Sequence, residues 1–164
     1  MENFEDLLAA NADFVKSFSK SELTGMARKN LAIVTCMDSR IDPLRIVGMT
    51  AGDAKILRNA GARVTEDVLR TLVLATHLLG VQRILVMPHT DCRMASKEES
   101  ELHADIKDLA GIDTRGIEFR TETDQRRALF TDIQRIESYP LLPLGIAVMG
   151  AIYDVKTGKL DPIN

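Results

Sequence analysis

Short apolar runs alternate with amphipathic segments along this chain, and this alternation constrains the fold more than any other feature. The continuous apolar runs predict strands, two of them with the pattern of strands buried on both faces, at 31–35, 54–58, 83–88 and 145–153. Helical spacing of apolar residues predicts helices at 4–18, 65–79, 97–110 and 124–139. Buried strands that alternate with helices indicate an α/β fold with a mostly parallel central sheet of about four strands.

Local signals place the ends of several of these elements. Asn3 and Thr65 are the expected N-caps of the first two helices, and Gly80 is the expected stop of the second. The segment 156–159 predicts a turn into a short last strand at 160–163, which adds an antiparallel edge to the sheet. No repeat or linker divides the 164 residues, so we expect one domain over 1–164.

Composition argues against several classes of partner. The net charge is −3 without a basic block, aromatic residues make up 4%, and Trp is absent, so nucleic acid is not an expected partner. No apolar run approaches the ~18–20 residues of a membrane span, and the first residues are acidic where a signal peptide would be basic. We therefore expect a cytoplasmic protein whose two cysteines are reduced. Phosphate-loop and dinucleotide fingerprints are absent.

Both cysteines directly follow strand signals. Cys36 comes after 31–35, and His89 and Cys92 form an H-x-x-C pattern after 83–88. If these strands are neighbours in a parallel sheet, the three side chains meet at one edge. Two thiolates and an imidazole suit zinc and leave a fourth position open, as in catalytic sites. The alternative is that these residues are ordinary core side chains.

Asp38 and Arg40 lie two and four residues beyond Cys36, in a C-x-D-x-R pattern. The carboxylate of Asp38 could reach the fourth metal position, as a ligand or as acceptor of a hydrogen bond from bound water. Arg40 could hold that carboxylate through a bidentate pair. Taken by itself, D-x-R is more often a surface ion pair in a loop.

Two further readings of the same residues remain open. In a thiol enzyme, Cys36 would be the nucleophile and His89 its base, which leaves Cys92 without a role. In a non-catalytic zinc module, Asp38 would close the fourth position as a permanent ligand. The first reading predicts activity without metal, and the second predicts that loss of Asp38 weakens metal binding.

Three motifs in this order and spacing resemble the β-class carbonic anhydrases: CMDSR (36–40), RNAGA (58–62) and PHTDC (88–92). The closing segment AVMGAIYDVKTGKL (147–160) is also similar to the last strand pair of that family. The resemblance covers roughly 30–160 and matches the compact, minimal members. Gly usually follows the second ligand cysteine in the family, whereas Arg93 stands here. That departure bears on substrate and rate more than on the metal.

The resemblance implies one zinc ion per subunit, bound by Cys36, His89 and Cys92, with Asp38 and Arg40 as the catalytic dyad. It implies that Arg58, Asn59, Ala60 and Gly61 line the floor near the metal. The implied reaction is reversible hydration of carbon dioxide to bicarbonate and a proton by a zinc-bound hydroxide. Hydrolysis of carbonyl sulfide or carbon disulfide on the same site is the alternative.

The resemblance also implies a homodimer or larger homo-oligomer. The N-terminal helical arm, residues 1–28, would pack on a partner subunit. The amphipathic pattern of 4–18 suits that role, although the pattern alone could equally cover the chain's own core. His77 and His103 lie outside the motifs, and we expect His77 to be structural and His103 to lie on a solvated helix face.

Overall fold

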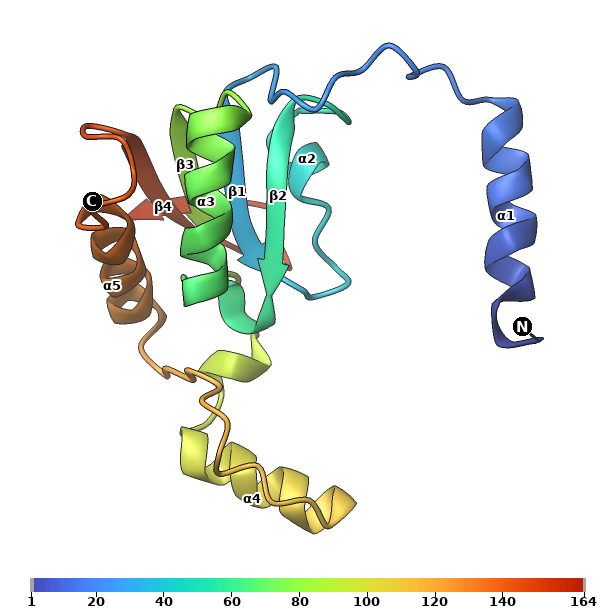
Figure 1. The fold of residues 1–164 in the computed structure, drawn as a ribbon. Helices are drawn as coiled ribbons and strands as arrows, with labels where there is room; N and C mark the ends of the chain where they lie inside the picture. The colour runs from blue at the N-terminus through green and yellow to red at the C-terminus, as the bar shows by residue number, and fades with distance from the viewer. Residues whose placement is uncertain (1, 164) are drawn as a thin grey trace.

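A five-stranded sheet in the order β2-β1-β3-β4-β5 forms the centre of the molecule. The computed structural model describes residues 2–163 (Figure 1). The central strand β1 (Leu31–Cys36) pairs in parallel with β2 (Ala54–Asn59) and β3 (Arg83–Met87), and β3 pairs in parallel with β4 (Ala147–Tyr153). The last strand, β5 (Leu160–Ile163), is antiparallel to β4. The sequence prediction of a mostly parallel sheet with an antiparallel edge is confirmed.

Within residues 2–163, five α-helices and three short 3₁₀ turns connect or flank the strands. The α-helices are α1 (Glu5–Lys16), α2 (Pro43–Ile46), α3 (Glu66–Leu78), α4 (Glu99–Ala110) and α5 (Gln125–Glu137). The 3₁₀ turns are η1 (Glu2–Phe4), η2 (Ala60–Ala62) and η3 (Arg93–Ala95). The turn η2 is formed by the last three residues of the RNAGA motif, and η3 directly follows PHTDC. Each comes after the end of a parallel strand, so both lie at the carboxyl edge of the sheet.

The predicted helix ends are correct in one case and wrong in another. Thr65 caps α3 by accepting a hydrogen bond from the Val68 N–H, and Gly80 has a positive φ just beyond the helix. Asn3 does not cap α1, because the 3₁₀ turn η1 includes it and α1 begins only at Glu5. The four-residue helix α2 was not predicted, since four residues carry no helical period.

The strands β1 and β3 bury both faces, as their continuous apolar character predicts. On one face, Val34 and Ile84 pack with α3 and α5 through buried side chains that include Leu72 and Leu129. On the other face, Ile33 and Leu85 belong to a second apolar cluster that also contains both cysteines and side chains of the 37–53 segment. The candidate metal ligands therefore lie at the rim of a packed core, which fixes their backbone positions.

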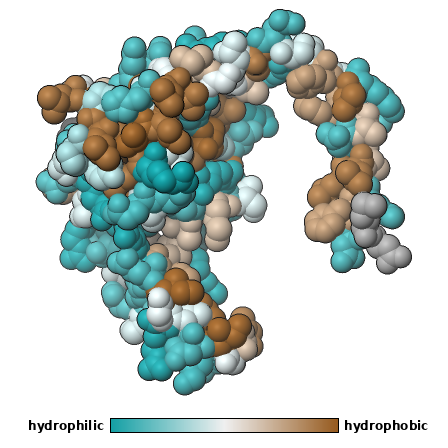
Figure 2. Space-filling model, in the orientation of Figure 1, coloured by the Kyte–Doolittle hydropathy of each residue, from teal (hydrophilic) through white to brown (hydrophobic). Residues whose placement is uncertain are grey.

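Two helices extend away from this core (Figure 1). None of the residues of α1 is buried, and α4 likewise has no buried residue. The apolar side chains of the N-terminal segment are between 51% and 63% exposed, and they are Phe4, Leu7, Leu8, Phe14, Val15 and Phe18. Figure 2 shows apolar surface on this separate helix. Among residues 2–163, no helix combines the length and apolar character needed to cross a membrane.

Candidate metal centre

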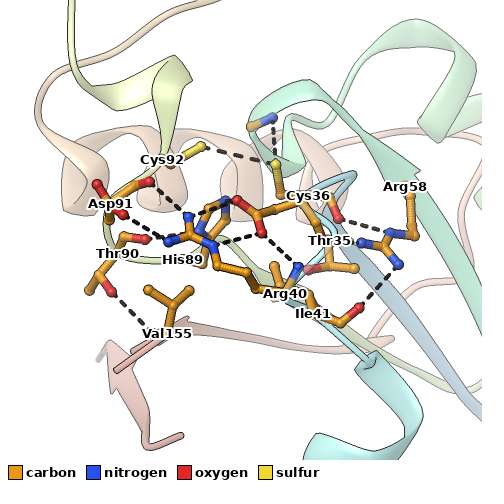
Figure 3. A network of polar contacts seen from close by, with 12 residues as sticks. Thr35, Cys36, Arg40, Ile41, Arg58, His89, Thr90, Asp91, Cys92 and Val155 are labelled. Carbon is orange, nitrogen blue, oxygen red and sulfur yellow. Dashed lines mark hydrogen bonds and ion pairs between the residues drawn. The ribbon is translucent and has the colours of Figure 1, made fainter. Parts of the chain in front are cut away.

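Adjacent parallel strands bring the three predicted ligands together. Thr35 of β1 pairs in register with Met87 of β3, and the Thr35 hydroxyl donates a 2.7 Å hydrogen bond to the Met87 carbonyl. Cys36 ends β1, and His89 and Cys92 follow β3 at the same edge of the sheet. The ligand atoms of these three residues all lie within 4.8 Å of one another, and all three side chains are buried (Figure 3).

This donor set fits a tetrahedral zinc ion. The two sulfur atoms are 4.0 Å apart, and two thiolates bound to tetrahedral zinc at 2.3 Å would be about 3.8 Å apart. The Nδ1 atom of His89 donates to the Thr90 carbonyl at 2.8 Å, so Nε2 keeps its lone pair. Nε2 is buried and has no hydrogen-bond partner within the described residues. A buried nitrogen lone pair beside two thiols is suited to a metal ion.

The two cysteine sulfur atoms are within hydrogen-bond distance of each other. This contact lowers the pKa of Cys36, although burial opposes the shift. The same contact, together with burial, raises the pKa of Cys92. Burial lowers the pKa of His89, but the nearby Cys36 thiolate and the Asp38 carboxylate outweigh burial and raise it. The lowered pKa of Cys36 favours the thiolate form, which is the form that a metal ligand must have.

Asp38 and Arg40 form the bidentate pair that the sequence suggested. Arg40 Nε donates to Asp38 Oδ1 at 2.9 Å, and Arg40 Nη2 donates to Oδ2 at 2.8 Å. These hydrogen bonds hold the pKa of Asp38 well below its usual range. Asp38 Oδ2 also lies 3.8 Å from His89 Nε2, so the carboxylate borders the candidate metal position. Both of its oxygens are engaged by Arg40, which leaves the fourth metal position free of Asp38.

Asp91 is a second carboxylate on Arg40 that the sequence analysis did not single out. Arg40 Nη1 donates to Asp91 Oδ2 at 2.8 Å, and Nη2 also donates to the Asp91 carbonyl at 3.1 Å (Figure 3). The guanidinium thus joins the loop after β1 to the loop after β3. Asp91 lies within the PHTDC motif, directly before the candidate ligand Cys92. That position was the signal from which the sequence could have identified it as a site residue.

Arg58 holds the loop that carries Asp38 rather than lining the metal position. Its guanidinium donates to the carbonyls of Cys36 (2.9 Å), Asp38 (2.6 Å) and Ile41 (3.2 Å) (Figure 3). Gly61, in contrast, reaches the site directly, because its N–H donates to the Cys36 sulfur at 3.4 Å. The RNAGA motif therefore contacts the site in two ways: Arg58 binds the backbone of the Asp38 loop, and Gly61 binds the Cys36 sulfur.

The remaining sequence expectations have mixed outcomes. His77 is exposed, and its Nε2 atom lies 2.9 Å from the Leu141 carbonyl, in agreement with a structural role. His103 was expected in solvent, but its side chain is only 15% exposed, packs against the Phe119 ring in a tilted arrangement and contacts the Thr114 hydroxyl. Arg93 is exposed, and in the part of the chain that the structure describes its guanidinium makes no hydrogen bond or ion pair.

The fold and the site together define an α/β protein with a Cys–His–Cys metal-binding set at the carboxyl edge of a parallel sheet and an Asp–Arg pair beside it. The family model described as carbonic anhydrase matches residues 31–160. Beta-carbonic anhydrase 1 of Mycobacterium tuberculosis is 35% identical over 160 residues, covering 98% of this chain and 97% of that protein. The chain belongs to the β-carbonic anhydrase family of enzymes.

Further relatives agree with this placement. The crystal structure of a carbonic anhydrase from Streptococcus mutans has a TM-score of 0.93 and 38% identity, covering 100% of this chain and 99% of that one. A carbon disulfide hydrolase from Acidithiobacillus thiooxidans is 28% identical over 156 residues, covering 82% of this chain and 77% of that protein. The family thus includes relatives named for different substrates.

Proposed function

We propose that this enzyme catalyses the reversible hydration of carbon dioxide to bicarbonate and a proton, with one zinc ion per subunit. The observation that carries the proposal is the convergence of Cys36, His89 and Cys92 beside an intact Asp38–Arg40 pair. A donor set of two thiols and one unpartnered imidazole nitrogen has room for a metal and leaves one position for water.

Asp38, Arg40 and Arg58 would have distinct roles in this reaction. Bound zinc supplies a Lewis acid that makes water nucleophilic near neutral pH. Asp38 would accept a hydrogen bond from the nucleophile and so orient its lone pair toward the carbon of the substrate. Arg40 fixes the carboxylate for this task through two hydrogen bonds and keeps it ionised. Arg58 holds the backbone of the same loop.

Carbon disulfide or carbonyl sulfide is the alternative substrate for the same site. Relatives named carbon disulfide hydrolase match at 27–28% identity, against 35% for the mycobacterial carbonic anhydrase, and they cover less of this chain. Higher identity and coverage support carbon dioxide as the first candidate. Both reactions need the same metal and the same dyad, so only turnover separates them.

We also propose that the active form is a homodimer or larger homo-oligomer, with the arm of residues 1–28 packed on a second copy. Three of the chain's five Phe residues lie on this arm, at positions 4, 14 and 18. An unpartnered apolar helix face of this kind indicates an interaction surface. Two buried free thiols are compatible with a reducing compartment, so we place the protein in the cytoplasm.

The test is stopped-flow carbon dioxide hydration on protein of known zinc content, with carbonyl sulfide and carbon disulfide assays on the same preparation. We expect hydration proportional to zinc content. Turnover of a sulfur compound with feeble hydration would assign the alternative substrate. Activity that persists without metal and is abolished by thiol alkylation would instead support a thiol enzyme. Zinc binding without turnover of any of the three substrates would contradict an enzymatic role.

A further inference from the structure

The strained turn η2 contains the N–H group that donates a hydrogen bond to the Cys36 sulfur. Gly61 and Ala62 are successive residues of η2 with φ of 79° and 60°. Gly adopts this left-handed region freely, whereas for Ala it is unfavourable. The turn nevertheless places the Gly61 N–H 3.4 Å from Cys36 Sγ. Contacts on either side of the turn must therefore stabilise it.

Asn59 and Arg63 bracket the turn. The Asn59 side chain accepts a hydrogen bond from the Arg63 N–H at 2.9 Å and donates to the Arg63 carbonyl at 2.7 Å. These two bonds join the residue before η2 to the residue after it. The backbone between them, including Gly61, is thereby held in one conformation. The position of Arg63 then decides where the Gly61 N–H points.

Arg63 is in turn anchored to Asp132 of α5. Its Nε atom donates to Asp132 Oδ2 at 2.7 Å, and its Nη1 atom donates to the Arg120 carbonyl at 2.8 Å. Asp132 Oδ1 accepts the Val64 N–H at 3.2 Å. The Asp132 side chain is 3% exposed and that of Arg63 is 15% exposed, so this ion pair is largely removed from water.

A carboxylate at this position departs from the pattern of its helix. The neighbouring inward positions of α5, Leu129, Ile133 and Ile136, belong to the apolar core. An apolar residue at 132 would continue that face, and a buried ion pair is seldom the more stabilising choice. A buried charged residue among apolar core residues is expected mainly where function requires it.

We propose that Asp132 is a positioning residue for the metal site. Through Arg63 and the η2 turn it aims the Gly61 N–H at Cys36 Sγ, and this hydrogen bond reduces the electron donation of that sulfur to the metal. Less donation leaves the metal more strongly Lewis acidic. The inference rests on the proposed function, because it requires Cys36 to be a ligand.

The test uses the cobalt(II)-loaded protein, in which thiolate ligands give sulfur-to-cobalt charge-transfer absorption. Asp132→Asn keeps an oxygen for the Val64 N–H but removes the charge that holds Arg63. We expect the charge-transfer band to move to longer wavelength, because a sulfur that loses its hydrogen bond donates more readily. We expect the zinc form to lose about tenfold in kcat for hydration.

Glu66→Gln is the matched control. It removes the exposed 2.7 Å ion pair between Glu66 of α3 and Arg135, which lies on the same helix as Asp132. This change perturbs an α5 contact without touching η2. We expect an unchanged band and unchanged hydration. A band shift of equal size in the control would overturn the proposal, since it would assign the effect to α5 in general.

The remaining outcomes are also decisive. If the unsubstituted protein shows no thiolate-to-cobalt absorption, the proposed metal site fails, and the inference fails with it. If that absorption is present and Asp132→Asn leaves band and kcat unchanged, the inference alone is wrong. Should Asp132→Asn fail to fold, Arg63→Gln decides, because it removes the cation through which Asp132 acts on the η2 turn. An unshifted band in that variant overturns the inference.

Discussion

Arg40 binds Asp38 through three hydrogen bonds, one from its backbone N–H and two from its guanidinium, at 2.8–2.9 Å. Arg115 binds Asp113 in the same way elsewhere in the chain, with an N–H and a guanidinium on one carboxylate two residues earlier. Asp91 and Arg93, and likewise Asp124 and Arg126, have the same spacing without forming such a pair, and Arg126 binds Asp161 instead. The D-x-R sequence therefore permits this geometry, and the conformation of the loop decides whether it forms. Only the first pair borders the candidate metal position, so location distinguishes the functional pair from the surface pair.

This duplication supplies a matched control for catalysis. We expect Asp38→Ala to lower kcat/KM for hydration by about 10²-fold with zinc content unchanged, because the carboxylate orients the nucleophile and is not a ligand. Asp113→Ala removes an equivalent pair on the surface and should leave hydration as it was. Metal analysis and stopped-flow assays of both variants provide the measurement. Loss of zinc from Asp38→Ala would instead favour a structural metal module.

Removal of the metal should abolish activity and lower stability together. A chelator should eliminate hydration, and added zinc should restore it. Because the metal binds only the folded state, saturation at 100 times Kd corresponds to about 2.7 kcal/mol of unfolding free energy. Cys92→Ser should reduce bound zinc strongly, whereas His77→Gln, at an exposed histidine outside the site, should not. Full zinc occupancy in Cys92→Ser, measured by elemental analysis, would contradict the assigned ligand set.

Much of this architecture is predictable from local sequence. The apolar runs at 31–35 and 83–88 predict two strands, and the position of Cys36, His89 and Cys92 after them makes these residues candidate ligands if the strands are neighbours. The structure shows that the two strands are adjacent. Thr65 and Gly80 delimit α3 as expected. These features depend on periodicity, on capping and on the rule that parallel strands present their carboxyl ends at one edge.

What the sequence could not provide depends on long-range contacts. Asp132 lies 40 residues beyond Cys92 in a helix whose pattern alone gives no reason to connect it with Arg63. The burial of His103 results from Phe119, which follows α4 and folds back on it. Asn3 failed as a cap because a 3₁₀ turn preceding α1 competes for the same residues. Tertiary packing decides each of these cases.

Asp53 gives a stability prediction that depends on pH. Its carboxylate accepts hydrogen bonds from Thr50 and Arg28, and these contacts lower its pKa in the folded chain. In the unfolded chain the pKa of Asp53 returns to about 3.9. At pH values between the folded-state pKa and the unfolded-state pKa, the unfolded state therefore binds more protons than the folded state. The stabilisation is therefore complete above about pH 4 and is lost as the pH falls toward the folded-state pKa.

Urea denaturation of Asp53→Asn from pH 2.5 to 7 tests this pH-dependent stabilisation by Asp53. The urea concentration at the unfolding midpoint should differ strongly between the variant and the unsubstituted protein at pH 7, and the difference should shrink below about pH 4. Asp13→Asn, at an exposed ion pair with Lys16, should change the midpoint little at any pH. A constant difference for Asp53→Asn across the range would exclude a role for its charge.

The exposed face of α1 predicts a defect in assembly when it is made polar. Leu8→Glu places a charge within the apolar face, and we expect a shift toward monomer in light scattering coupled to size exclusion. Ala9→Glu introduces the same residue on the opposite face of the helix and should leave the mass unchanged. Equal masses for the two variants would mean that this face does not join subunits.

Gly61 cannot be replaced without moving the candidate metal site. A Cβ atom there would lie 2.9 Å from Met94 Cβ, in the turn directly after Cys92, and φ is +79°. Gly158→Ala is the control, because its φ is +75° and nothing lies within 4 Å of the added carbon. Gly158→Ala should lower the free energy of unfolding only by the roughly 1–2 kcal/mol of left-handed backbone strain, measured by urea denaturation.

Gly61→Ala should lower the free energy of unfolding by about 1–3 kcal/mol more because of overpacking. It should also weaken zinc binding, because η2 and η3 must separate. Equal destabilisation of the two variants with unchanged zinc affinity would mean that the contact between these two turns does not position the site.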